Sequence, residues 1–253
     1  ISTSQIISSK IYPKAIIFDL GLSSLQIKDE KRGFSFNSKN CLNMEMGINK
    51  YTAYDIVNEL DKNYLGKLIK ILGEEKEGKK IANAIEKFRS KKKIKTSDEL
   101  AKIINSAKKK YYNSKRNPAT KTFQAIRIFV NQELTELILG LIEATKILQE
   151  GGILIVVSFH SLEDKIVKYF FSLYSNLKEN PSRYLPSKEN KSQLFKLASK
   201  KPLMPSEKEI KKNRNSRSAK LRYVTRNDNS FFYPKEFKKR FENYFNLEEI
   251  KLW

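Results

Sequence analysis

Two short runs of apolar residues, at 14–20 and 153–157, stand out along a chain that is otherwise polar or helically patterned. Each run is continuous instead of alternating, which is typical of a parallel strand that is covered on both faces. The first strand is predicted to end at Asp19, and the second leads into residues 158–164 and a helix that runs to about Leu173. This order of strands and helices predicts an α/β sheet.

Residues 52–110 have a different pattern, in which apolar side chains recur at helical spacing. Thr96 and Glu99 have the spacing of a capping box at the start of the third helix. We therefore predict a small insert of three helices, preceded by an ordered polar loop at 28–50. Its apolar positions are Ile56, Val57, Leu60, Leu65, Leu68, Ile69, Leu72, Ile81, Ala84, Ile85, Phe88, Leu100, Ile103, Ile104 and Ala107.

A long helix is predicted after residue 116, with Asn117 as its cap and Pro118 at its first position. One apolar stripe continues from Phe123 to Leu148, and a Gly151-Gly152 pair follows it. Glycine is the residue that most often ends a helix, so we expect a single helix up to this pair.

The C-terminal third is polar and basic, with further short elements. Ser206 and Glu209 could cap a short helix, and residues 219–226 alternate well enough for a strand. Phe237, Phe241, Tyr244 and Phe245 share a helical face that we expect to pack on the body of the protein. The predicted organisation is a main domain at 1–50 and 117–228, a helical insert at 51–116, and an amphipathic tail at 229–253.

The net charge of the chain is more informative about its partner than any of these elements. Fifty Lys and Arg residues against 28 Asp and Glu give a net charge of +22. Such an excess favours a polyanionic partner, with nucleic acid ahead of an anionic membrane. An AT-rich genome would enrich lysine as well, and the 40 Lys against 10 Arg agree with that reading. The runs at 91–93 and 108–110, the latter followed by Tyr111 and Tyr112, could hold phosphate and stack a base, or could be solvated helix ends.

Cysteine and histidine each occur once, as Cys41 and His160. No intrachain disulfide can form, and neither a Cys-based nor a His-rich metal site is expected. No apolar run is long enough to cross a bilayer. We therefore expect a soluble cytoplasmic protein with no membrane partner and no bound metal.

Ligands of open α/β sheets bind outside the carboxyl ends of the strands. The two predicted strands end at Asp19 and Ser158, and His160 follows directly. An aspartate there can accept hydrogen bonds from an amino group of a ligand, or it can cap its own loop. His160 can contact a ligand or have a structural role. The residues alone do not decide between these two roles for Asp19 or for His160.

Several segments together resemble one family, the 16S rRNA (cytosine-N4)-methyltransferases known as RsmH or MraW. The match covers roughly residues 14–226; each motif is weak alone, but the set is specific. The segments are 18–21 with Ser23, Ser24 and Gln26; 32–36; 73–75 with Ile81, Ala82, Ala84 and Ile85; 117–134; 158–164; Lys201-Pro202; and 216–222.

The resemblance implies a Rossmann-like class I methyltransferase with an inserted helical domain, and S-adenosylmethionine as the cofactor. The substrate would be the N4 amine of a cytidine in the decoding centre, in small-subunit rRNA or a 30S particle. Asp19 and Gln26 would contact the cofactor, and Asp19 would also orient the amine. Contacts with the substrate are expected from Ser158, His160, Arg127, Asn131, Lys220 and Arg222. A homodimer is left open.

Some features depart from the family. Leu25 stands in place of proline, Asn117 in place of histidine, and Asn43 and Glu45 where Asp and Arg are common. The chain opens with Ile1, and the resemblance places three βα units, on the order of 80–100 residues, before the first predicted strand. We therefore expect an N-terminally truncated sequence that binds the cofactor weakly and is inactive as given. The alternatives are a methyltransferase of another amino group and a non-catalytic RNA-binding module.

Overall fold

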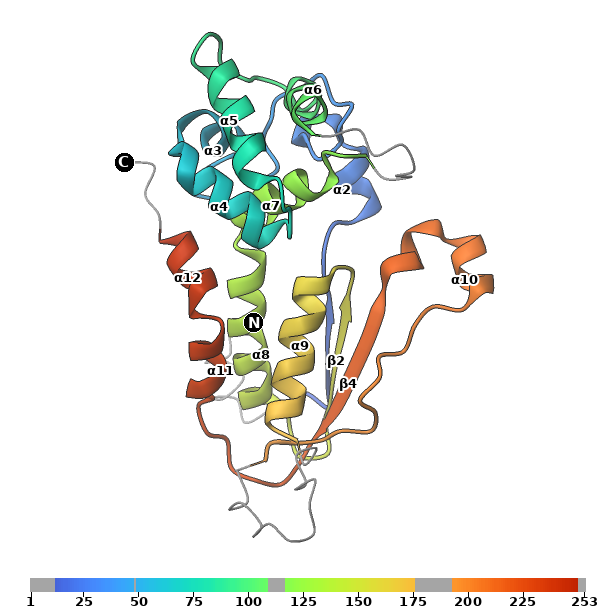
Figure 1. Ribbon diagram of the computed structural model, residues 1–253. Helices are drawn as coiled ribbons and strands as arrows, with labels where there is room; N and C mark the ends of the chain where they lie inside the picture. Colours follow the sequence, from blue (N-terminus) through green and yellow to red (C-terminus); the bar gives the residue numbers. More distant parts are fainter. Residues whose placement is uncertain (1–11, 48, 109–116, 176–192, 250–253) are drawn as a thin grey trace, which may run out of the picture. The chain divides into compact units, whose positions relative to one another are not determined.

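The computed structural model describes residues 12–47, 49–108, 117–175 and 193–249, which form two compact units (Figure 1). One unit, which we call the sheet unit, contains the chain up to Gly21 and Leu134–Asn243. The other, the helical unit, contains Leu22–Glu133 and the chain from Tyr244 onward. No helix of the described residues is both long and apolar enough to cross a membrane.

The sheet unit has a four-stranded sheet in the order β1-β2-β4-β3. Strands β1 (Ala15–Asp19) and β2 (Ile153–Ser158) are parallel, as the two apolar runs predict. Strand β4 (Lys220–Arg226) pairs antiparallel with β2, and the short β3 (Phe195–Lys196) pairs antiparallel with β4. The predicted mixed α/β architecture is confirmed, and it is consistent with a class I methyltransferase fold.

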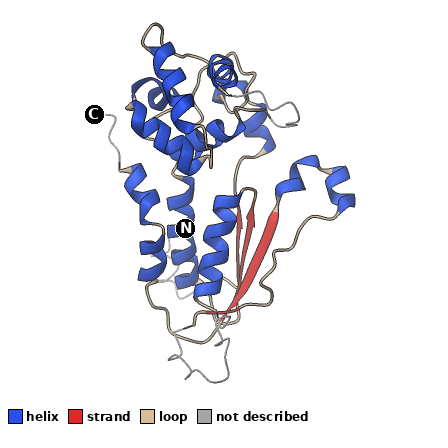
Figure 2. Ribbon diagram, in the orientation of Figure 1, coloured by secondary structure: helices blue, strands red, loops and turns tan. Residues whose placement is uncertain are grey.

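Helices α8 (Glu133–Ile147) and α9 (Ser161–Leu173) lie on one side of the sheet (Figures 1 and 2). Leu154 and Val156 of β2 are buried on that face. The tail forms two short helices, α11 (Lys235–Arg240) and α12 (Glu242–Glu248), where one helical face was expected. The prediction that this face packs on the body is confirmed for Phe237 and Phe241, whose rings contact Tyr169 of α9.

Strand β1 is not buried on both faces, which corrects the prediction from its continuous apolar run. Ile17 is 65% exposed, and Ala15 and Asp19 are exposed as well. The reason is positional, because β1 is an end strand among the described residues and helices cover only the other face. The apolar run therefore predicts the strand correctly but not its surroundings.

Within the predicted insert, the described residues 52–108 form four helices, where the apolar spacing predicts three. They are α3 (Ala53–Glu59), α4 (Lys62–Leu72), α5 (Gly78–Arg89) and α6 (Ser97–Ala107). The break between α3 and α4 comes at Asp61, whose side chain accepts hydrogen bonds from the amides of Asn63 and Tyr64 and starts a new helix. The capping box of Thr96 and Glu99 is confirmed at the start of α6.

The single helix predicted between residues 117 and 150 is two helices, α7 (Thr120–Asn131) and α8. Gln132 lies between them with a φ of 52°, a left-handed conformation that interrupts the helix. The start is also later than predicted: Asn117 accepts a hydrogen bond from the Ala119 amide in a turn, and the helix begins at Thr120. It ends at Ile147, before the glycine pair.

The predicted ordered loop at 28–50 is held by hydrogen bonds between its own residues and α6. It follows α2 (Ser24–Lys28) and contains the 3-10 helix η1 (Glu30–Arg32). The Met44 amide donates to the Arg32 carbonyl at 2.7 Å, and the Ser97 hydroxyl donates to the Gly33 carbonyl at 2.6 Å. Gly33 has a φ of 70°, which suits the residue that ends the 3-10 turn.

The basic runs have different outcomes. Lys92 and Lys93 form ion pairs with Glu99 and Glu59, so part of the 91–93 run is engaged locally. Residues 109–116, which include Tyr111 and Tyr112, lie outside the described residues. A further basic stretch joins β3 to β4 and contains α10 (Glu207–Lys212), capped by Ser206 as predicted, and the 3-10 helix η2 (Arg214–Ser218).

Candidate active site at the strand ends

The two parallel strands end side by side, as the sequence predicts. Asp19 is in register with Val157, and the Leu20 amide donates to the Val157 carbonyl at 3.1 Å. On the other side of β2, Ser158 is in register with Lys220 at the start of β4. We call this edge of the sheet unit the strand-end rim: Asp19–Gly21, Ser158–His160 and Lys220.

Asp19 is the acidic residue of the rim. Its side chain is exposed, and Gly21 two residues later has a φ of 93°. An exposed carboxylate at the carboxyl end of a parallel strand can accept hydrogen bonds from an amino group or face a positive charge. The carboxylate therefore fits either role that the family resemblance gives it.

Ser158 faces the covered side of the sheet. It is 2% exposed, and its hydroxyl donates to the Lys220 carbonyl at 3.4 Å. In this arrangement Ser158 ties β2 to β4, and a direct contact with a substrate would require the hydroxyl to change partner.

His160 caps helix α9 together with Glu163. The Glu163 amide donates to His160 Nδ1 at 3.5 Å, while Glu163 Oε2 accepts from the amides of Phe159 and His160 at 2.9 and 3.2 Å. His160 Nε2 lies 3.1 Å from Glu163 Oε1 without the alignment of a hydrogen bond. Glu163 is 2% exposed, and its two hydrogen bonds hold the backbone of Phe159 and His160 in place.

Lys220 and Arg222 converge on one carboxylate, that of Asp164. Lys220 Nζ lies 3.1 Å and Arg222 Nε 2.7 Å from the Asp164 oxygens. Burial alone would raise the pKa of Asp164, but the hydrogen bonds from Arg222 and Lys220 outweigh it and lower this pKa below its ordinary value. Both cations are thus neutralised in part, and they join α9 to β4.

Gln26 belongs to a capping box at the start of α2. Its Oε1 accepts from the Ser23 amide at 2.9 Å, and its own amide donates to the Ser23 hydroxyl at 3.2 Å. The side-chain NH2 of Gln26 donates to none of the described residues, which leaves a donor free for a ligand. Gln26 belongs to the helical unit and Asp19 to the sheet unit.

Arg127 and Asn131, the other two expected substrate residues, are engaged within the helical unit. Arg127 makes a bidentate ion pair with Glu133, at 2.7 and 2.8 Å. Asn131 Oδ1 accepts from the Met46 amide at 2.7 Å, and its Nδ2 donates to the Met44 carbonyl at 2.8 Å. Asn131 therefore ties the ordered loop to α7.

Sequence reasoning gave no role to Glu163 or Asp164. Glu163 follows His160 by three residues, which is the spacing of a capping box and could have been noticed. Asp164 meets Lys220 and Arg222 across 56 and 58 positions of sequence, and no local pattern announces such a pair.

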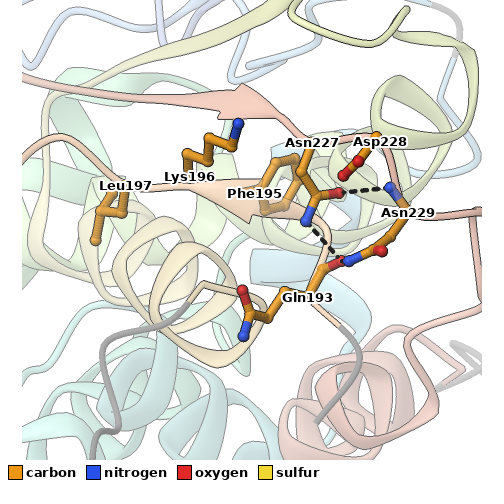
Figure 3. A pocket seen from close by; sticks show the side chains of 7 residues that line it. All are labelled: Gln193, Phe195, Lys196, Leu197, Asn227, Asp228 and Asn229. Carbon is orange, nitrogen blue, oxygen red and sulfur yellow. Dashed lines mark hydrogen bonds between the residues drawn. The ribbon is translucent and has the colours of Figure 1, made fainter. Parts of the chain in front are cut away.

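A shallow pocket of about 360 Å3 lies at the opposite end of the sheet from the rim, where β4 ends and β3 begins. Figure 3 shows the amides of Asn227 and Asn229 turned toward Gln193, whose carbonyl accepts from both of them at 2.9 and 2.8 Å. The side-chain amides of Asn227 and Asn229 are thus already bonded to the Gln193 carbonyl. Because the pocket lies at the other end of the sheet, it is separate from the edge at which α/β sheets bind ligands.

The chain matches known proteins over most of its length. The profile of the MraW methylase family matches residues 3–227. Proteins named ribosomal RNA small subunit methyltransferase H are similar to it. The one from Caldicellulosiruptor saccharolyticus is 45% identical over 208 residues, which cover 82% of this chain and 67% of the relative. The one from a Sulfurihydrogenibium strain is 46% identical over 209 residues, 82% of this chain and 66% of the relative.

The relative from Methylorubrum extorquens AM1 is 42% identical over 214 residues, which cover 84% of this chain but 61% of the relative. The chain thus spans between 61% and 67% of the length of these three proteins. The motifs that form the strand-end rim and the loop on α7 lie inside the matched region. Sequence, fold and comparison agree that the chain belongs to the MraW methylase family.

Proposed function

We propose that the whole protein transfers a methyl group from S-adenosylmethionine to small-subunit rRNA in the cytoplasm. We further propose that the acceptor is the N4 amine of a cytidine in the decoding centre. The observation that carries the proposal is the register of β1 with β2, which sets Asp19 beside the turn that leads from Ser158 to His160. The family, and the printed names of its members, support the reaction class.

The residues present suit the cofactor's chemistry. S-adenosylmethionine, when bound, supplies an electrophilic methyl group on a sulfonium, and it also carries amino groups. Asp19 offers an exposed carboxylate for an amino group or for the positive charge, and Gln26 offers a free side-chain NH2. We propose each of them, taken within its own unit, as a cofactor contact, as the family resemblance implies.

The cytosine amine is a weak nucleophile because its lone pair is delocalised into the ring. An acceptor such as Asp19 can take a hydrogen bond from the amine N–H and hold the nitrogen in line for attack. The target base has to leave its stack before it reaches such an edge. In this proposal His160 and Glu163 hold the rim rigid, while the helical insert at 51–116 contacts the rRNA backbone.

The test is methyl transfer with the product identified. Small-subunit particles and naked rRNA are each incubated with labelled S-adenosylmethionine and the protein, and the nucleosides are separated and weighed by mass spectrometry. N4-methylcytidine is expected, and Asp19→Ala should lower its yield by at least about 100-fold if Asp19 orients the amine. Label in N6-methyladenosine would show instead that the protein methylates a different amino group. Binding without any transfer would leave a non-catalytic RNA-binding protein.

A further inference from the structure

The stretch between β3 and β4 carries a dense positive charge that the active-site proposal does not use. We call residues 196–217 the basic arm. It holds eight Lys and Arg residues against Glu207 and Glu209, all eight are exposed, and none forms an ion pair with a described residue. The eight are Lys196, Lys200, Lys201, Lys208, Lys211, Lys212, Arg214 and Arg217.

The arm is folded locally although it is hardly buried. Ser206 caps α10 by accepting from the Glu209 amide at 3.2 Å, and α10 packs on η2. The Ser216 hydroxyl donates to the Asn213 carbonyl at 2.7 Å, which closes η2. Figure 1 shows α10 beyond β4, on the side of the sheet away from α9. The cations are therefore presented on an ordered scaffold.

Two apolar side chains interrupt this charge. Leu203 and Met204 are 58% and 57% exposed. The backbone of Leu203 is fixed, because it exchanges two hydrogen bonds of 2.9 Å with Leu221 of β4. A large apolar side chain on an anchored backbone, with Lys200 and Lys201 just before it in the sequence, is suited to a partner that has apolar faces between negative charges.

The C-terminal end of the arm lies at the strand-end rim, whereas Lys196 at its other end pairs with Thr225 near the far end of β4. Lys220, directly after η2 and Ala219, is in register with Ser158. Arg222 pairs with Asp164 of α9 and also donates to the Lys200 carbonyl at 2.9 Å, so it joins the arm to the helix that starts at the rim. A polyanion held by the arm would consequently pass the edge where Asp19 lies.

We infer that the basic arm binds RNA next to the methylated nucleotide, through its lysines and arginines to phosphates and through Leu203 and Met204 to unstacked bases. This inference rests on the proposed function and names the surface that positions its substrate. RNA fits better than a lipid surface, because a membrane-bound helix needs a broad apolar face and Ile210 is the only large apolar residue of α10. Apolar side chains that pack against a base step, flanked by cations, are a known way of stabilising distorted nucleic acid.

The experiment measures binding of the full 253-residue chain to a fluorescein-labelled transcript of a small-subunit rRNA stem with an internal loop. Anisotropy titrations are run at several KCl concentrations. The test variant is K208Q/K211Q/K212Q, and the matched control is K165Q/K168Q/K235Q, which removes the same charge from exposed positions on α9 and α11. A second test variant, L203S/M204S, keeps all charges.

The arm triple variant should bind on the order of 10- to 100-fold more weakly at physiological salt, and its slope of log Kd against log salt should fall by about 2. The control should lose less than about threefold, since it removes only long-range attraction. L203S/M204S should weaken binding several-fold with an unchanged salt slope. Thermal unfolding checks each variant, and K196Q/R214Q/R217Q replaces the arm triple if its melting point falls.

Equal losses in the arm triple and the control, with tight binding by the parent chain, would overturn the inference and leave the proposed function standing. A parent chain that binds neither the transcript nor 30S particles would instead contradict the proposed function. Phosphatidylserine vesicles are the third ligand, and loss of vesicle binding without loss of RNA binding would assign the arm to a membrane and refute the inference.

Discussion

Replacing Asn131 with alanine tests whether this residue positions the loop or touches the substrate. Its side chain makes four hydrogen bonds: with the Met46 amide, the Asn49 side chain, and the carbonyls of Met44 and Arg127. A net hydrogen bond contributes about 1 kcal/mol, and a buried group left without a partner costs about 1–3 kcal/mol. Because Asn131 is only half-buried, water can replace part of the loss. We therefore expect about 2–3 kcal/mol of destabilisation of the helical unit.

The assay combines urea unfolding with amide hydrogen exchange in residues 42–53. The Met46 amide should lose protection because its acceptor is the Asn131 oxygen, while the Met44 amide, which donates to Arg32, should lose less. Asn105→Ala on the exposed face of α6 is the control and should change stability by less than about 0.5 kcal/mol. If Asn131→Ala keeps full stability and protection but loses RNA affinity, the positioning role is refuted and direct contact is favoured.

Three further outcomes are expected. The Asp164 pKa is lowered by its two cationic partners, so its stabilising contribution is complete above the ordinary value of 3.8 and is lost as pH falls through the lower folded value. Asp164→Asn should thus lower stability by about 1–3 kcal/mol at pH 7, and pH-dependent melting should show the gap to the parent closing below about pH 4. Gly33→Ala should destabilise by more than about 1 kcal/mol in urea unfolding, because φ is 70° and the new Cβ would lie 2.5 Å from the Cys41 carbonyl; an unchanged midpoint would contradict the local geometry. Arg226 is 6% exposed, and its guanidinium donates to the carbonyls of Leu194, Asn227 and Asn229. Arg226→Met should therefore cost about 2–4 kcal/mol by calorimetry, and a loss below about 1 kcal/mol would show that water satisfies those carbonyls.

The sequence predicts elements better than their surroundings. The apolar runs locate β1 and β2, because a short run of consecutive apolar residues is by itself typical of a parallel strand. The same run cannot show that Ile17 is exposed, since exposure depends on what covers the sheet. The break at Gln132 is equally hidden: the apolar stripe continues across it, and only the backbone φ reveals two helices.

The candidate site divides in a similar way. Asp19 and Ser158 could be placed at one rim because carboxyl ends of parallel strands meet at the same edge. The engagement of Arg127 by Glu133, and of Lys220 by Asp164, could not be predicted, because side-chain pairing depends on distances that a motif does not contain. Their roles toward a substrate stay predictions.

Among the described residues β1 has a partner strand on one side only, which has a practical consequence for a purified sample of this chain. Unpaired strand edges recruit other strands, and natural sheets discourage this with short edges and charges. Here β1 has only five residues, and the charged Lys14 and Asp19 stand on either side of the exposed Ile17 in the sequence. Removing the Asp19 charge to probe chemistry would also weaken this guard against self-association. A genuine catalytic defect should persist on dilution, whereas a loss caused by aggregation should recover.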